Sequence, residues 1–133
     1  MEKGLTKTEL VLMGSGELSF LGDSVYEVNI RKELLLRGVR SSASLVEASQ
    51  KYTSAVSQSE ILTLIYDELK ENENNIVNRG RNYKSKHVPK NVSRAKYSSA
   101  TALECLFGYL SLCDDQGRID ELIAMIFDKV NVL

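Results

Sequence analysis

Apolar residues recur at helical spacing along most of the chain, and no segment shows the clean two-residue alternation of a strand. The pattern predicts helices over residues 5–13, 17–37, 55–71, 100–112 and 118–130, a helix of about ten residues that ends at Tyr52, and a short helix that ends near Gly80. Breaks are expected at residues 14–16, 53–54, 71–75 and 114–117, where small or polar residues gather. We therefore expect an all-α single domain of six to seven helices over residues 1–133.

The predicted helix over residues 17–37 carries both an apolar stripe and a pair of acids. Leu18, Leu21, Val25 and Val28 are expected to face the core. Asp23 and Glu27 lie four residues apart and so share one face of the helix. Spacing alone allows either a solvated acidic face or a site for a divalent metal, since carboxylates are the hard oxygen ligands that Mg²⁺ takes.

Glu104 is the second carboxylate of interest. Its neighbours one turn away on the predicted helix include Ala100, Phe107 and Gly108, which are small or apolar. A glutamate on that stripe is either a boundary residue paired with a lysine or a partly buried carboxylate that needs a cation. If the fold brings Glu104 beside Asp23, the two would form a metal site suited to phosphodiester hydrolysis.

Residues 78–97 differ from the rest of the chain in charge and periodicity. Seven of the 17 Lys and Arg residues fall here, no acidic residue does, and the stretch holds the only proline. We expect a long surface loop, which is either simply solvated or suited to nucleic-acid phosphates.

Composition narrows the alternatives without selecting a function. The formal net charge is −1, so attraction to nucleic acid has to come from a local patch. No apolar run approaches the ~20 residues of a membrane span and no signal-peptide core is present, so we expect a cytoplasmic protein with no membrane partner. Cys105 and Cys113 lie eight residues apart on one predicted helix, too far to form a disulfide.

Four separated motifs, in the same order, resemble the ribonuclease III family. Residues 20–25 (FLGDSV) resemble its signature helix, and residues 102–110 (ALECLFGYL) resemble its second motif. Residues 79–85 (RGRNYKS) with 89–91 (PKN), and residues 54–62 (SAVSQSEIL), are similar to its Mini-ribonuclease III group, which lacks a separate double-stranded-RNA-binding domain. The resemblance implies a single ribonuclease III-like endonuclease domain with no separate RNA-binding domain.

The same resemblance implies an active site with Mg²⁺ as cofactor. Asp23 and Glu104 are the implied catalytic residues and metal ligands, and Glu27 is either an outer-shell partner or a surface residue. Two positions depart from the wider family: Ser19 stands where a metal-binding glutamate is usual, and Thr101 stands where an aspartate is usual. The departures fit the Mini-ribonuclease III group and leave open whether one or two metal ions bind.

The resemblance also implies a homodimer that cleaves double-stranded RNA. Phe20, Leu21 and Tyr26 are the expected dimer interface, with packing inside one chain as the alternative. The residues expected to bind RNA are Arg79, Arg81, Asn82, Lys84, Lys86, Lys90 and Arg94.

Three functions remain open from the sequence. The first is an endoribonuclease that matures the ends of the 23S ribosomal RNA precursor, for which a ribosomal-protein helper is an open question. The second is a catalytically weak RNA-binding or ribosome-associated module of the same fold. The third is an all-α scaffold whose basic stretch is incidental.

Overall fold

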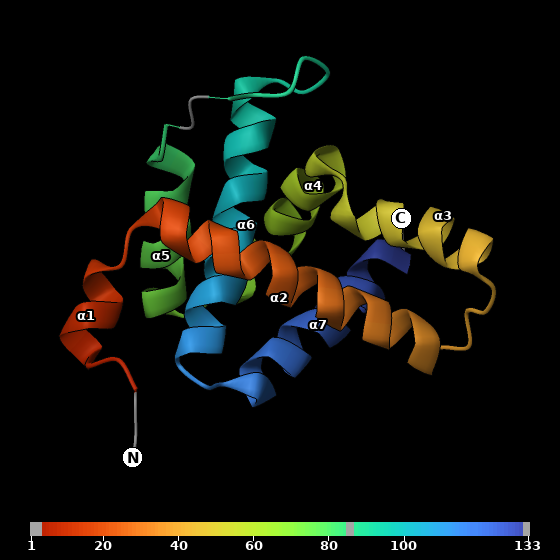
Figure 1. The fold of residues 1–133 in the computed structure, drawn as a ribbon, viewed down its shortest axis with the longest axis horizontal. Coiled ribbons are helices and arrows are strands. Elements are labelled where there is room, and N and C mark those ends of the chain that lie inside the picture. The colour runs from red at the N-terminus through yellow and green to blue at the C-terminus, as the bar shows by residue number, and fades with distance from the viewer. Residues whose placement is uncertain (1–3, 85–86, 132–133) are drawn as a thin grey trace.

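The computed structural model describes residues 4–84 and 87–131. Within these ranges, every secondary-structure element is an α-helix or a 3₁₀ turn (Figure 1). No strand occurs in these ranges, which confirms the prediction of an all-α fold. In chain order the elements are α1 (Lys7–Leu12), α2 (Ser15–Leu36), α3 (Ser42–Thr53), α4 (Ala55–Ile65), the 3₁₀ turn η1 (Tyr66–Glu68), α5 (Glu71–Asn82), α6 (Arg94–Leu112) and α7 (Gln116–Asn131).

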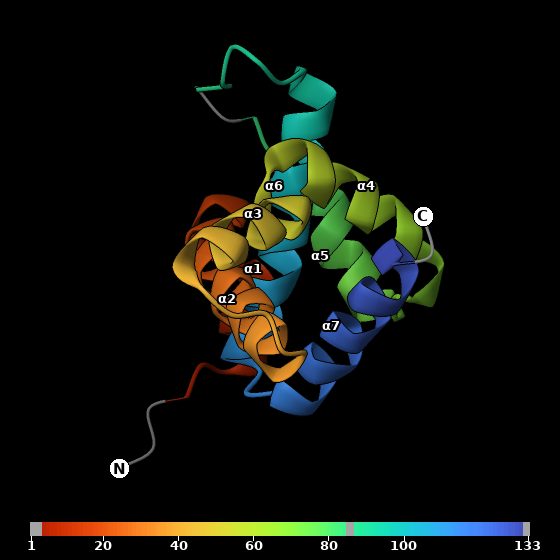
Figure 2. The same cartoon turned by 90° about the vertical axis from the view of Figure 1, so that its right-hand side faces the viewer.

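α6 is the central helix of the domain, and the other long helices pack around it (Figures 1 and 2). Ten of its 19 residues are buried, on all sides of the helix rather than along one stripe. It contacts α2, α4, α5 and α7, and its contact with α2 is the most extensive in the structure. A residue on α6 next to α2 is therefore held from several directions.

α2 turns a narrower face to the core than the sequence predicted. Its buried residues are Leu18, Gly22, Tyr26, Ile30 and Leu34, which follow one another at four-residue intervals. Tyr26 donates a hydrogen bond to the Tyr52 carbonyl at 2.7 Å and packs edge-on against Phe107. The prediction that Val28 faces the core is wrong, because Val28 lies on the opposite side of α2 and is 54% exposed.

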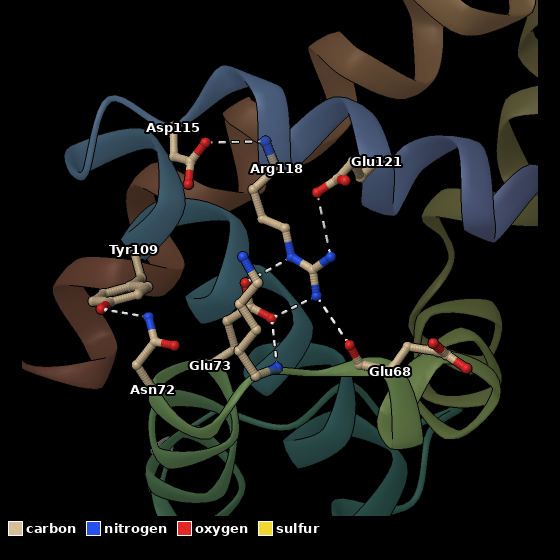
Figure 3. Close-up of polar contacts among 8 residues, drawn as sticks. Glu68, Asn72, Glu73, Tyr109, Asp115, Arg118 and Glu121 are labelled. Atoms are coloured by element: carbon tan, nitrogen blue, oxygen red, sulfur yellow. Dashed lines mark hydrogen bonds and ion pairs between the residues drawn. The ribbon is translucent and has the colours of Figure 1, made fainter.

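A buried ion pair joins the start of α5 to the start of α7 (Figure 3). The Arg118 guanidinium donates to both carboxylate oxygens of Glu73, at 2.8 and 2.9 Å, and to the Glu68 carbonyl at 3.0 Å. Glu73 also accepts from the Lys70 backbone N–H, so it caps α5 as well. Burial raises the pKa of Glu73, but the hydrogen bonds from Arg118 and Lys70 outweigh it, and the net shift is downward.

Three predicted boundaries are corrected by the structure. The polar residues 71–75 are the first turns of α5 and not a break, and residues 94–99 are the first turns of α6. Within the described residues, only 83–84 and 87–93 of the predicted loop over 78–97 therefore lie outside the helices. The predicted helix over 55–71 ends at Ile65 and continues as the turn η1.

Among the described residues, no helix combines the length and the apolar character that crossing a membrane requires.

Candidate active site

The site lies where α2 and α6 cross at Gly22 and Gly108. A methyl group on Gly22 would collide with the backbone of Glu104, and one on Gly108 would collide with the backbone of Leu18. Only glycine fits at both positions, so the two helix backbones are in direct contact. Asp23 follows Gly22, and Glu104 precedes Gly108 by one turn, which brings both acidic residues to the crossing.

The structure thus brings the two predicted carboxylates together from positions 81 residues apart. Burial, with a smaller contribution from the adjacent Asp23 carboxylate, raises the pKa of Glu104 to about 7. Asp23 itself is exposed at the rim. Two carboxylates held this close favour either a shared proton or a cation between them.

Ser19 is the third polar group at the crossing. It lies one turn before Asp23 on α2, and its hydroxyl donates a hydrogen bond to Glu104 Oε1 at 2.9 Å. This bond lowers the pKa of Glu104 and opposes the effect of burial. The sequence identified Ser19 only as a departure from the family pattern, and nothing in its local context indicated a contact with a residue 85 positions away.

An open cavity of about 420 Å³ lies over these groups. Its polar lining comes from four helices. The residues are Ser19, Asp23 and Ser24 of α2, Thr53 of α3, Gln58 of α4, and Tyr97, Thr101 and Glu104 of α6. Gln58 is part of the motif at residues 54–62, and no role was predicted for it.

The donor set fits a hard divalent cation bound mainly through water. In the described part of the chain, no group of three or more His, Cys, Asp or Glu side chains is arranged to hold a metal. The carboxylates at the crossing are those of Asp23 and Glu104. Mg²⁺ commonly takes one or two carboxylates from a protein and keeps several waters. Thr101, where the family has an aspartate, lines the cavity as a neutral hydroxyl.

Glu27 does not share this site. Its carboxylate pairs with Arg31 at 3.0 Å along the surface of α2, and it is not among the residues that line the cavity. Glu27, predicted to be either an outer-shell partner or a surface residue, therefore forms a surface ion pair in the structure.

Two of the predicted RNA-binding arginines have structural contacts. Arg79 donates to the carbonyls of Val11 and Met13, at 2.8 and 2.6 Å, and so holds the end of α1. The prediction that Arg79 lies in the surface loop is wrong, because it lies on α5, where both of its terminal nitrogens donate hydrogen bonds; its contact with RNA stays a prediction. Arg81, also on α5, places its guanidinium 4.9 Å from the centre of the Tyr66 ring.

The remaining predicted RNA contacts lie at the end of α5, at the start of α6 and between them, where residues 87–93 extend beyond the end of α6 in Figures 1 and 2. Asn82, Lys84 and Lys90 are exposed, and Arg94 is the exposed first residue of α6. Lys86 lies outside the described residues. None of these positions is tested by contact with RNA, so they stay predictions.

The predicted dimer residues separate into different environments. Phe20 is 84% exposed and Leu21 is partly buried, but Tyr26 is only 1% exposed. The prediction for Tyr26 is wrong, because its ring fills the core of its own chain and cannot reach a partner. Exposed apolar residues on the Phe20 side of α2 are Val28 and Leu35, at 54% and 46%.

Fold and site together define an all-α domain in which a glycine-mediated helix crossing pairs two carboxylates under an open cavity. Comparison with known proteins gives this class a name, since residues 16–115 match the Ribonuclease III domain. Mini-ribonuclease 3 of Brevibacillus brevis is 39% identical over 110 residues, which cover 83% of this chain and 82% of that protein. Mini-ribonuclease 3 of a Thermoanaerobacter species is 36% identical over 121 residues, which cover 91% and 85%.

A solved structure agrees with these sequence matches. The crystal structure of a Fusobacterium nucleatum protein is similar with a TM-score of 0.79 and 29% identity, and the match covers 91% of this chain and 97% of that one. The chain therefore belongs to the ribonuclease III family, and within it to the Mini-ribonuclease 3 group. It is accordingly an endoribonuclease.

Proposed function

We propose that this endoribonuclease cleaves double-stranded RNA with Mg²⁺ held by Asp23 and Glu104. The observation that carries the proposal is the pair itself: two carboxylates, brought together by the crossing of α2 and α6, face an open cavity. Mg²⁺ bound there would supply an activated water and positive charge beside the phosphate under attack. Hydrolysis of the P–O3′ bond would leave a 5′-phosphate and a 3′-hydroxyl.

The protein's own groups then have separate roles. Glu104 is the partly buried ligand, and the Ser19 hydroxyl holds one of its oxygens in a fixed direction and favours its ionised form. Asp23, exposed at the rim, is the ligand nearer to solvent and to an incoming phosphate.

The connection between α5 and α6 is the proposed surface for RNA. Asn82, Lys84, Lys90 and Arg94 are exposed on or beside it, and we retain Lys86 from the sequence prediction. Lysine and arginine side chains at such a surface contact phosphates and 2′-hydroxyls and so recognise the A-form shape more than the base sequence.

The proposed assembly is a homodimer through the exposed apolar side of α2, with Phe20 and the partly buried Leu21 at its centre. The proposed substrate is the base-paired stem that joins the ends of the 23S ribosomal RNA precursor, processed in the cytoplasm with or without a ribosomal-protein helper. Names of the relatives support ribonuclease activity; the stem is the expectation from the sequence resemblance.

The test is cleavage of an end-labelled RNA stem with Mg²⁺, with mapping of the product ends. Asp23→Asn should reduce cleavage by more than about 100-fold, since outer-shell partners alone contribute roughly 10- to 100-fold. Asp128→Asn, which alters an exposed aspartate on α7, is the matched control and should cleave normally.

Circular dichroism of both variants separates loss of chemistry from loss of fold. An unchanged helical spectrum is expected for Asp23→Asn because the side chain is exposed. RNA binding by the wild-type protein without any Mg²⁺-dependent product would favour the catalytically weak RNA-binding module, which the neutral Ser19 and Thr101 keep as the second candidate.

A further inference from the structure

Gln58 is a buried polar side chain that lines the active-site cavity and has no assigned role. It lies on α4, lines the cavity together with residues of α2 and α6, and is only 4% exposed. Its backbone N–H bonds to Ser54 within the helix. Its side-chain amide has no hydrogen-bond partner among residues 4–84 and 87–131.

The amide of Gln58 is unpaired but still reaches the cavity. Within the described chain, the only buried side-chain polar atom that is both sealed from solvent and unpaired is Asn74 Oδ1. Since the Gln58 amide has no partner and is not sealed, its polar atoms contact the open volume. A polar group in such a position is stabilised only when something in the cavity bonds to it.

The chemistry of the Gln58 amide limits which ligand groups could be its hydrogen-bond partner in the cavity. Gln58 presents an N–H₂ donor and a carbonyl acceptor, whereas the neighbouring Asp23 and Glu104 present only acceptors when ionised. A phosphate oxygen would satisfy the donor alone, and a cation would satisfy the acceptor alone. A hydroxyl can do both, and the 2′-hydroxyl is the group of an RNA backbone that both donates and accepts.

We propose that Gln58 determines specificity for RNA by binding the 2′-hydroxyl of a nucleotide that flanks the scissile phosphate. The inference rests on the proposed cleavage of double-stranded RNA and extends it to the choice of RNA over DNA. In this proposal Gln58 contacts the ribose from α4, while Asp23 and Glu104 act from α2 and α6. The residue that recognises the sugar is therefore on a different helix from the metal ligands.

The test pairs a change in the protein with a change in the substrate. The cleavage position is first mapped on an all-ribose stem, and stems are then made with a single 2′-deoxy nucleotide on either side of that bond. kcat/KM is measured for the wild type, for Gln58→Met, which keeps the length of the side chain without the amide, and for Gln50→Met as control. Gln50 is an exposed glutamine on α3 outside the cavity.

One deoxy position should reduce wild-type kcat/KM by about tenfold, the range of one neutral hydrogen bond. Gln58→Met should lose about as much on the all-ribose stem and show no further loss on the deoxy stem. Gln50→Met should behave as wild type. Non-additivity of this kind identifies a direct contact, which a merely structural effect of Gln58 would not produce.

Three results overturn the inference, and they differ from one another. An equal deoxy penalty in wild type and Gln58→Met would show that another residue reads the hydroxyl. Absence of any penalty in the wild type would show that no 2′-hydroxyl beside the scissile bond is recognised; this measurement needs no variant, so it stands even if Gln58→Met fails to fold. No cleavage of the all-ribose stem would overturn the proposed function itself.

Discussion

At the scale of single residues, Ser19 is a neutral side chain that would support the proposed metal site through Glu104 and not as a ligand. The hydroxyl occupies the place of a family carboxylate, but it donates to Glu104 instead of offering an oxygen to a cation. Such a bond fixes the direction of the acceptor and favours its ionised form. The site thereby keeps one buried ligand in place with one fewer negative charge.

Replacement of Ser19 by alanine should weaken metal binding without unfolding the protein. We expect affinity for Mn²⁺, used as a probe in place of Mg²⁺, to fall by about tenfold, at the lower end of the range for outer-shell partners. Isothermal titration calorimetry measures this directly without RNA. Ser19→Thr keeps the hydroxyl and should retain most of the affinity; equal affinities in Ser19→Ala and wild type would remove Ser19 from the metal site.

Glu104 should make the stability of the metal-free protein depend on pH. Its pKa is raised from 4.5 to about 7, chiefly by burial, so the folded chain holds this proton more tightly than the unfolded chain. The free energy of unfolding should therefore fall as the pH rises from about 4.5 to about 7. Mg²⁺, if held by Glu104 as proposed, would bind the ionised carboxylate and offset part of that loss.

Urea unfolding with a chelator, at about pH 5 and about pH 7.5, measures this effect. Glu104→Gln cannot ionise and should lose the dependence that Glu104 contributes. Glu47→Gln, at an exposed position on α3, should keep it. If the free energy of unfolding of Glu104→Gln depended on pH just as that of the wild type does, Glu104 would not be the source of the pH dependence.

At the scale of helices, the site depends on how closely α2 and α6 approach. Asp23 and Glu104 meet because Gly22 and Gly108 leave no side chain between the two backbones. The contact between α2 and α6 is the most extensive in the structure, and ten of the 19 residues of α6 are buried, so neither helix can shift without disturbing the core.

Gly22→Ala should therefore destabilise the fold and separate the carboxylates. The added methyl meets the Glu104 backbone, which cannot move aside as a flexible side chain would, and we expect a loss of about 3 kcal/mol in the free energy of unfolding. Gly117→Ala on α7 is the matched control. There a methyl meets nothing closer than Asp115 Oδ1 at 3.7 Å, and alanine favours the helix, so stability should be unchanged or slightly higher.

The helices with apolar stripes could be predicted from the sequence, and those held by distant partners could not. Thr6 and Ser41 cap α1 and α3 through local hydrogen bonds that residue patterns encode. α5 begins in a polar stretch that looked like a turn, and its start is held by Glu73 bonding to Arg118, 45 residues away. α6 begins at an exposed polar turn capped by Ser93, before any apolar residue indicates a helix.

The same distinction applies to the site. Asp23 and Glu104 could be chosen from two motifs, but their contact depends on a crossing that neither motif describes alone. Gln58 belongs to a motif that the sequence showed. That its amide is buried at the cavity without a hydrogen-bond partner depends on the tertiary structure and could not be predicted. The basic residues were predicted to lie in one loop over 78–97, but Arg79 lies on α5, and its carbonyl partners at the end of α1 lie 66 and 68 residues away.

At the scale of the whole molecule, the apolar surface of α2 adjoins the active-site cavity. Phe20 is 84% exposed and also lines the cavity beside Asp23, so a partner that covered Phe20 would border the site. Val28 and Leu35 continue the apolar side along the same helix. Exposed apolar residues grouped in this way are typical of an interaction surface.

Phe20→Ser should convert the proposed dimer to a monomer while leaving each chain folded, since the ring makes little contact with its own core. Sedimentation velocity should show the mass fall from twice 14.9 kDa to a single chain. Leu12→Ser, at a leucine 74% exposed on α1, is the control and should stay dimeric. A wild-type protein that sediments as a monomer at micromolar concentration would contradict the proposed assembly. If Phe20→Ser is monomeric, its cleavage of the RNA stem then measures how far one site depends on the neighbouring chain, because the partner is expected to form part of the cavity wall.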